Sequence, residues 1–239
     1  MSKFRFADLN IEFLPPNKYL DYQLRDYSVV SENTDISLTI SEVDMQFERK
    51  QKENLNTQKH DFFITNTVAL RKIAEKLPFY DSAVFHSCAF AVDKKGVALT
   101  ARSGTGKTTH MLLWKEMLGE KFNIVNGDKP FIRIIDDNLY VYGSPWAGKE
   151  GLNANISSPL TDICLISRSK TNFTEKLSKQ EGIDILMQQI YMPLDVSARL
   201  KTLELIYKIA EKVNFWQINC NMEPEAAEVA YNAIFGKNQ

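Results

Sequence analysis

The feature that most constrains this chain is the stretch Ser-Gly-Thr-Gly-Lys-Thr-Thr at positions 103–109. It follows an apolar run at 97–100 that is typical of a strand, and residues at helical spacing begin at Thr108. A loop between a strand and a helix can turn several backbone N–H groups toward one anion, and glycine leaves room for that anion. The sequence therefore predicts a phosphate-binding loop. Its residues are Ser103, Gly104, Thr105, Gly106, Lys107, Thr108 and Thr109.

The loop follows the Walker A pattern Gly-x-x-x-x-Gly-Lys-Ser/Thr, except that Ala101 replaces the first glycine. In this pattern the lysine reaches the β- and γ-phosphates, and the next hydroxyl is a ligand of Mg²⁺. These roles fall on Lys107 and Thr108, so we expect a nucleotide and Mg²⁺. The alternative, a chance glycine turn before a helix, is disfavoured because a strand precedes the loop and a helix follows it.

The segments around the loop predict an α/β fold with a mixed sheet. The runs 88–92 and 97–100 are joined by a turn too short for a crossover helix, so they are expected to pair antiparallel. Such hairpins argue against a purely parallel, doubly wound sheet. We expect further strands at 122–125, 131–135, 139–142, 162–166 and 215–219, and helices at 108–119, 181–192, 198–213 and from Pro224.

The N-terminal part is expected to be rich in strands. Short apolar runs alternate with turn residues and predict strands at 4–6, 11–13, 27–30 and 36–40. Residues 47–60 are polar and predict an exposed connection or an edge hairpin. Apolar residues at helical spacing predict a helix over 66–77 that Pro78 ends.

We therefore expect a single domain over 1–239. It would hold a strand-rich N-terminal subregion at 1–60 and a nucleotide-binding core at 84–150.

The composition narrows the expected partners and compartment. The net charge of −1 disfavours nucleic acid. No apolar run approaches the roughly 18 residues that a spanning helix needs, which disfavours a membrane protein. Three cysteines lie far apart and outside any metal or redox spacing, as is typical of buried thiols in a reducing compartment. The expected location is the cytoplasm.

Three features together resemble a known family. The loop Ser-Gly-Thr-Gly-Lys-Thr-Thr is similar to those of ATP-dependent phosphoenolpyruvate carboxykinase and of HPr kinase/phosphorylase. His86 precedes the two predicted strands before the loop, and Gly127-Asp128-Lys129 stands where HPr kinases carry two aspartates and a basic residue. Over residues 84–150 the chain most resembles the small HPr-kinase-like proteins of bacterial peptide-modification gene clusters.

The resemblance implies roles for individual residues. Asp128 would face Mg²⁺ or act as the base that orients an acceptor hydroxyl, and His86 would lie near the γ-phosphate. There His86 would orient an aspartate or stabilise charge on the transferred group, while Lys107 would support in-line attack on the γ-phosphate. Gly127 departs from the family, because the first aspartate of its pair is missing here.

A second glycine-containing segment, Gly143–Gly151, leaves two interpretations open. It could be a surface turn with Trp146 packed onto the core. It could instead be a substrate loop, in which Lys149 meets phosphate or acceptor and Trp146 shields the site; the small HPr-kinase-like proteins have a similar segment. Of the remaining basic residues, Lys129 is expected to face the nucleotide and Arg133 to form a salt bridge. His110 is expected to be either structural or exposed to solvent, and nothing in the sequence around His60 indicates a function.

From these features we expect an ATP- and Mg²⁺-dependent phosphotransferase. Its acceptor would be a hydroxyl, either a serine of a peptide or protein or a small molecule. Three alternatives remain: a nucleotide sensor or partner-binding subunit without activity, an ATPase or GTPase without acceptor, and carboxykinase chemistry. A homo-oligomer also stays open, because HPr kinase itself is oligomeric.

Overall fold

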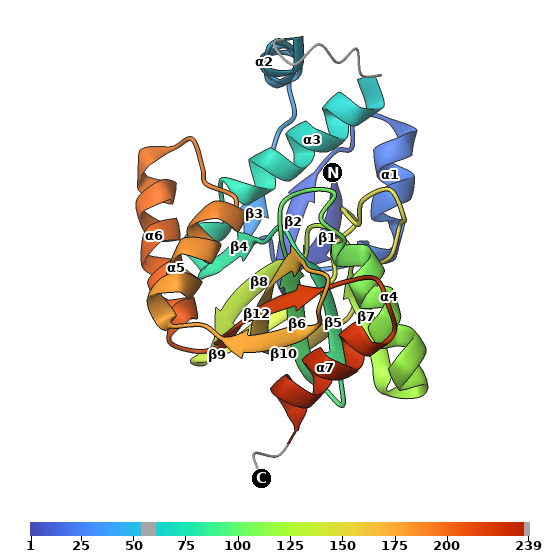
Figure 1. The fold of residues 1–239 in the computed structure, drawn as a ribbon. Helices are drawn as coiled ribbons and strands as arrows, with labels where there is room; N and C mark the ends of the chain where they lie inside the picture. The colour runs from blue at the N-terminus through green and yellow to red at the C-terminus, as the bar shows by residue number, and fades with distance from the viewer. Residues whose placement is uncertain (54–60, 237–239) are drawn as a thin grey trace.

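The computed structural model describes residues 1–53 and 61–236, and it shows a mixed α/β protein (Figure 1). Its helices and strands follow one another in this order: β1 (Ser2–Phe6), β2 (Leu9–Phe13), α1 (Lys18–Leu24), β3 (Ile36–Ser37), α2 (Glu42–Glu53), α3 (Asp61–Ala74), β4 (Ser82–Val84), β5 (Cys88–Val92), β6 (Lys95–Thr100), α4 (Lys107–Leu118), β7 (Phe122–Asn126), β8 (Phe131–Ile135), β9 (Asn138–Tyr142), β10 (Ser157–Arg168), β11 (Phe173–Lys176), α5 (Lys179–Gln189), α6 (Val196–Ala210), β12 (Asn214–Cys220) and α7 (Glu225–Phe235).

The main sheet of the described chain has nine strands of mixed direction. Its order is β4-β8-β9-β10-β6-β5-β7, and β12 pairs with β10 and β11. The hairpin of β5 and β6 is antiparallel, whereas β10 runs parallel to both β6 and β12. The predicted α/β class, the mixed sheet and the antiparallel pair are therefore confirmed.

Helices cover both faces of this sheet, because side chains alternate between the faces with the period of two that a strand imposes. Helices α5 and α6 lie on one face and α4 and α7 on the other (Figure 1). The first face presents Ala89, Ala98 and Ile163, and the second presents Cys88, Leu99 and Cys164.

A second sheet, β1-β2-β3, forms near the N-terminus. Its predicted strands at 4–6 and 11–13 are confirmed. The strand predicted at 27–30 is wrong, because Tyr27 ends a short 3₁₀ turn and only Ser28 forms an isolated bridge, to Phe4. Of residues 36–40, Ile36–Ser37 form strand β3. Helix α1 was not predicted; Asn17 caps it by accepting the N–H of Leu20 at 2.9 Å.

The polar segment at 47–60 is not an exposed connection where the structure describes it. Its first part belongs to helix α2, and residues 54–60 and His60 lie outside the described residues. The helix predicted over 66–77 begins earlier, at Asp61, and ends at Ala74; Pro78 lies in a separate 3₁₀ turn. The division into a subregion at 1–60 and a core at 84–150 stays a prediction.

The predicted elements of the C-terminal third are confirmed, with ends shifted by a few residues. Ser178 opens α5 with a capping box, in which its hydroxyl accepts the N–H of Glu181. Pro224 stands at the N-cap of α7, and just before it the side-chain oxygen of Asn221 accepts the N–H of Glu223 at 3.0 Å. None of the helices in the described residues is long and apolar enough to cross a bilayer.

Candidate functional site

The predicted loop lies between β6 and α4, in the strand–loop–helix arrangement that the sequence predicts. Gly104 and Gly106 have φ angles of +78° and +123°, which residues with a side chain rarely adopt. A Cβ built at either glycine would meet no heavy atom of the described chain within 4 Å, chain neighbours aside. The loop is therefore open on the side of these glycines, and a phosphate would have room there.

The remaining predicted loop residues differ in exposure. Ser103 and Thr109 are exposed, whereas Thr105 is half-buried and its hydroxyl donates to the carbonyl of Arg102 at 2.8 Å. The N–H of His110 donates to the carbonyl of Gly106 at 2.9 Å and so closes the first helical turn. Phosphate binding by these residues stays a prediction.

Lys107 folds back over its own loop and is only 8% exposed. Its ammonium donates to the carbonyl of Ala101 at 3.2 Å and lies 3.3 Å from Nε2 of His86. Burial lowers the pKa of Lys107, against the opposing influence of nearby Cys88 and Asp128. The ammonium is thus the cation at the centre of the site, held close to the open loop.

His86 lies between β4 and β5, next to Lys107; its place near the γ-phosphate, which the resemblance implies, stays a prediction. Its N–H donates to the carbonyl of Gln189 at 2.9 Å, and its Nδ1 lies 3.1 Å from Oε1 of the same residue. An amide oxygen accepts from Nδ1–H, so Nε2 presents its lone pair to the Lys107 ammonium. Burial and then the Lys107 charge lower the pKa of His86, against the influence of Asp128. The imidazole is therefore neutral near pH 7.

Asp128 is the third member of a cluster with Lys107 and His86. Its Oδ1 lies 3.5 Å from Nε2 of His86. Its other carboxylate oxygen is paired with the ammonium of Lys129, so Lys129 meets a protein carboxylate in this structure. Strand β7 ends at the fully buried Asn126, whose side-chain oxygen accepts the N–H groups of Asp128 and Lys129 at 2.9 and 2.8 Å. This turn fixes the direction of the Asp128 carboxylate.

Cys88 lies between helix α4 and the turn that carries Asp128. Its thiol donates to the carbonyl of Gly127 at 2.9 Å and lies 3.7 Å from the hydroxyl of Thr108. Burial raises the pKa of Cys88 to about 11, so the thiol is protonated. All three cysteines are free and buried, as expected.

The structure explains the glycine at position 127. A Cβ added there would lie 3.1 Å from the carbonyl oxygen of Ala147 and 3.2 Å from that of Leu152. The chain after β9 therefore occupies the place that a side chain at 127 would need. An aspartate could stand at this position only if that segment moved.

The second glycine-containing segment packs against the cluster. Trp146 is 6% exposed, stacks on Phe131 with a centroid distance of 5.9 Å, and donates to the side-chain oxygen of Asn66 at 2.6 Å. The packing of Trp146 on the core is confirmed, although residues 143–147 are buried and do not form a surface turn. A role of this segment as a substrate loop, with Trp146 shielding the site, stays a prediction. The same segment turns at Gly148, where a Cβ would lie 3.1 Å from Cβ of Asp128. Lys149 follows this turn and is exposed, and its catalytic role stays a prediction.

Three residues of the site were missed by sequence reasoning. Gln189 orients His86, and Asn126 orients Asp128, as described above. Arg168, at the end of β10, donates to the carbonyls of Gly104 and Thr105 at 2.6 and 3.2 Å. Asn126 had a local signal, because an asparagine that ends an apolar strand before Gly-Asp is typical of such turns; the other two had none.

Two further basic residues have structural roles. Arg133 donates to the carbonyls of Ala7 and Tyr80, so the predicted salt bridge is wrong. His110 is 2% exposed and structural, as expected; its ring nitrogens have no hydrogen-bond partner in the described chain, and burial lowers its pKa to about 4.

Thr108 and Asp128 are the oxygen donors that could bind a magnesium ion arriving with a nucleotide, and this role stays a prediction. No group of three or more His, Cys, Asp or Glu in residues 1–53 and 61–236 could hold a metal by itself. Mg²⁺ usually binds one or two protein oxygens, phosphates and water, and does not need such a cage. Thr108 contacts the Cys88 thiol, and this thiol donates to the carbonyl of Gly127, the residue before Asp128. Thr108 and Asp128 are therefore both adjacent to residues that Cys88 contacts or to Cys88 itself.

Comparisons with known proteins give a distant likeness among the solved structures. No family model and no curated protein matches the sequence. The solved structure of the Hpr(Ser) kinase/phosphatase from Coxiella burnetii is similar with a TM-score of 0.36 and 11% identity, over 63% of this chain and 95% of that chain.

Proposed function

We propose that this chain is an ATP- and Mg²⁺-dependent phosphotransferase that acts on a hydroxyl acceptor, such as a serine of a peptide or protein or a small molecule. One observation carries the proposal: Lys107, His86 and Asp128 come from three separate parts of the chain and meet beside an open, glycine-lined loop. This set supplies a cation, a neutral imidazole and a carboxylate where the γ-phosphate of a bound nucleotide would lie.

Phosphoryl transfer needs positioning and charge stabilisation more than covalent chemistry from the protein. The loop N–H groups and Lys107 would bind the phosphates, and Mg²⁺, held by Thr108 and Asp128, would neutralise their charge. The Asp128 carboxylate is the candidate acceptor for the hydroxyl proton, and His86 contacts both Lys107 and Asp128. Buried surroundings strengthen each of these interactions.

A nucleotide sensor without transferase activity is the second candidate. It is favoured by Gly127, because the neighbouring segment leaves no free space for the second aspartate of the resembling family. Both candidates predict nucleotide binding, and only the first predicts a phosphorylated acceptor.

Calorimetry with ATP and Mg²⁺ tests the binding that both candidates require. Lys107→Ala is expected to weaken binding by at least about 100-fold, since a buried cation that contacts phosphate is lost. Lys115→Ala removes the same charge from an exposed position of the same helix and is the matched control. Equal affinity of wild type and Lys107→Ala would contradict the proposed site.

Transfer of label from γ-labelled ATP, with and without cell extract, separates the candidates. Label on a peptide, protein or metabolite that disappears in Asp128→Asn supports the phosphotransferase. Hydrolysis without any labelled acceptor indicates an ATPase, and binding without turnover indicates the sensor.

A further inference from the structure

The backbone of the phosphate loop has an outer side as well as an inner one. A loop that turns its N–H groups toward an anion turns carbonyl groups away from it, and those carbonyls need donors of their own. The carbonyl of Arg102 is satisfied within the loop, by the N–H and the hydroxyl of Thr105 at 3.2 and 2.8 Å. The carbonyls of Gly104 and Thr105 receive their donors from elsewhere in the chain.

Both donors belong to Arg168. Its Nη2 donates to the carbonyl of Gly104 at 2.6 Å, and its Nε donates to that of Thr105 at 3.2 Å. The guanidinium is planar, and its N–H groups point in fixed directions, so two bonds to successive carbonyls restrict how the loop can turn. A lysine has the same charge but no fork of this kind.

The sheet explains why a residue so far along the sequence reaches the loop. Strand β10 runs parallel to β6, with Leu165 opposite Thr100, so both strands point their carboxyl ends to the same edge. Strand β6 becomes the loop at this edge, while β10 continues to Arg168. The end of β10 is held on its other side by β12, with Arg168 opposite Cys220, and the N–H of Ser169 donates to the carbonyl of Cys220 at 2.9 Å.

We propose that Arg168 is a positioning residue, which holds the loop in the conformation that binds phosphate by fixing the carbonyls of Gly104 and Thr105. Its contacts lie on the carbonyl side of the backbone, so it acts through the loop and need not touch the ligand. The inference depends on the proposed function only for the identity of that ligand.

The first test needs no ligand. Amide NMR signals of Gly104, Thr105 and Gly106 are expected to move, and their hydrogen exchange to accelerate, in Arg168→Ala and also in Arg168→Lys. Lys170→Ala removes a charge from an exposed position two residues further on and should leave these signals in place. Unchanged loop signals in both Arg168 variants would overturn the proposal, whatever the protein binds.

The second test measures binding of ATP with Mg²⁺ by calorimetry. We expect Arg168→Ala to raise Kd about ten-fold and Arg168→Lys about three-fold, because bonds of charged donors are lost. Lys170→Ala is expected to change Kd by less than about two-fold, as screened surface charges do. If Arg168→Lys matches wild type in both tests, the charge alone matters and the two-carbonyl contact is refuted.

The outcome can be separated from that of the proposed function. A wild-type protein that binds no ATP contradicts the proposed function, while the NMR test still decides the role of Arg168. A lower melting temperature of Arg168→Ala with unchanged loop signals and unchanged Kd would reduce Arg168 to a merely structural residue and overturn the inference.

Discussion

The phosphate-binding loop at 103–109 and the segment at 143–151 both carry closely spaced glycines, but the space around those glycines differs. A Cβ at Gly104 or Gly106 would point into space that is free of described atoms, whereas one at Gly143 would lie 1.7 Å from the carbonyl oxygen of Ala154. The first two glycines leave room for a ligand, and Gly143 lets the chain pack on itself. Glycine density in a sequence therefore does not distinguish a binding loop from a packed one.

The largest expected effect is on Gly143. A side chain there cannot be accommodated without moving the backbone at Ala154, so Gly143→Ala should lower the free energy of unfolding by about 4 kcal/mol or more. Urea unfolding followed by circular dichroism measures the change.

Gly151→Ala is the matched control in the same segment. Gly151 has a φ of +62°, and a Cβ there would meet no described atom within 4 Å, chain neighbours aside. Only backbone strain of about 1 kcal/mol is expected. Equal stability of the two variants would break the distinction between packed and open glycines.

The next largest effect on stability is expected from the protonation of His110, which lies on the buried side of α4. Burial lowers the pKa of His110 from 6.5 to about 4, so the folded protein binds this proton less readily than the unfolded chain. The contribution of the neutral His110 imidazole to the free energy of unfolding is therefore fully present above pH 6.5, and it is lost as the pH drops from 6.5 to 4. At about 1.4 kcal/mol for each pKa unit, the loss is about 3 kcal/mol.

Unfolding of wild type and His110→Leu across this pH range checks the effect. The difference in stability between the two proteins should shift in favour of the variant as the pH falls. A difference that does not change with pH would show that His110 is not the group responsible.

A smaller effect is expected at Gly127, which is packed less tightly than Gly143. Gly127→Ala places a methyl group 3.1 Å from a carbonyl oxygen, so the segment must shift slightly, at a cost of about 1 to 2 kcal/mol. Gly127→Asp should cost more and should not tighten Mg²⁺-dependent nucleotide binding. A stable Gly127→Asp protein that binds Mg²⁺·ATP more tightly would show that the segment yields easily.

The smallest effect on stability is expected at Gly104. Gly104→Ala meets no steric obstacle, so only the strain of a positive φ remains, about 1 kcal/mol. Its affinity for ATP should nevertheless fall, because the methyl group would point into the space kept for phosphate. Urea unfolding measures the stability and calorimetry measures the affinity. An affinity that is unchanged in Gly104→Ala would show that the space beside Gly104 does not hold phosphate.

Several elements could be predicted because their signals are local. The β5–β6 hairpin follows from two apolar runs and a short turn, and α4 follows from apolar spacing after the loop. His86 and Asp128 were expected near Lys107 because they resemble residues of a known family, and the structure brings all three together.

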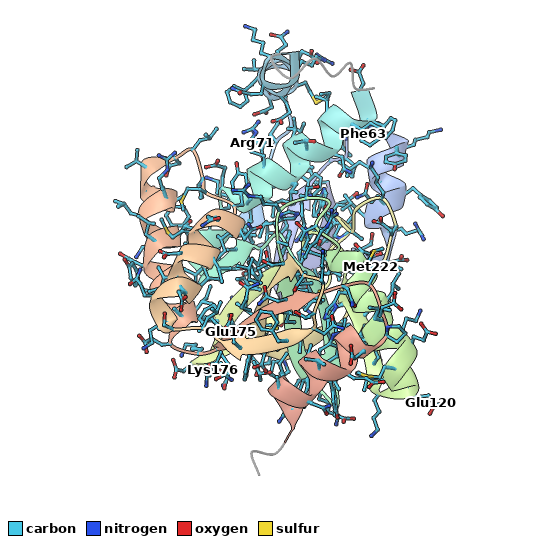
Figure 2. The ribbon with its side chains drawn as sticks, in the orientation of Figure 1. Phe63, Arg71, Glu120, Glu175, Lys176 and Met222 are labelled. Atoms are coloured by element: carbon cyan, nitrogen blue, oxygen red, sulfur yellow. The ribbon has the colours of Figure 1, made fainter. Side chains whose placement is uncertain are left out.

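Helix α2 escaped prediction because distant contacts stabilise a segment that is polar in sequence. Arg71, labelled in Figure 2, extends from α3 toward α2 and pairs with Glu48 and Asp44 at 3.2 and 3.6 Å. Lys72 adds a bond of 2.8 Å to Asp44. Such pairing is invisible in a window of neighbouring residues.

Local signals in the sequence predict the loop, its lysine, and the strand and helix that flank it, because φ preferences and apolar periodicity act over a few residues. How the loop, His86 and Asp128 are held in place depends on contacts between distant parts of the chain. Gln189 lies 103 residues from His86, and Arg168 lies 64 residues from Gly104. These hydrogen bonds depend on which strand ends share one edge of the sheet, and that arrangement arises when the whole core packs.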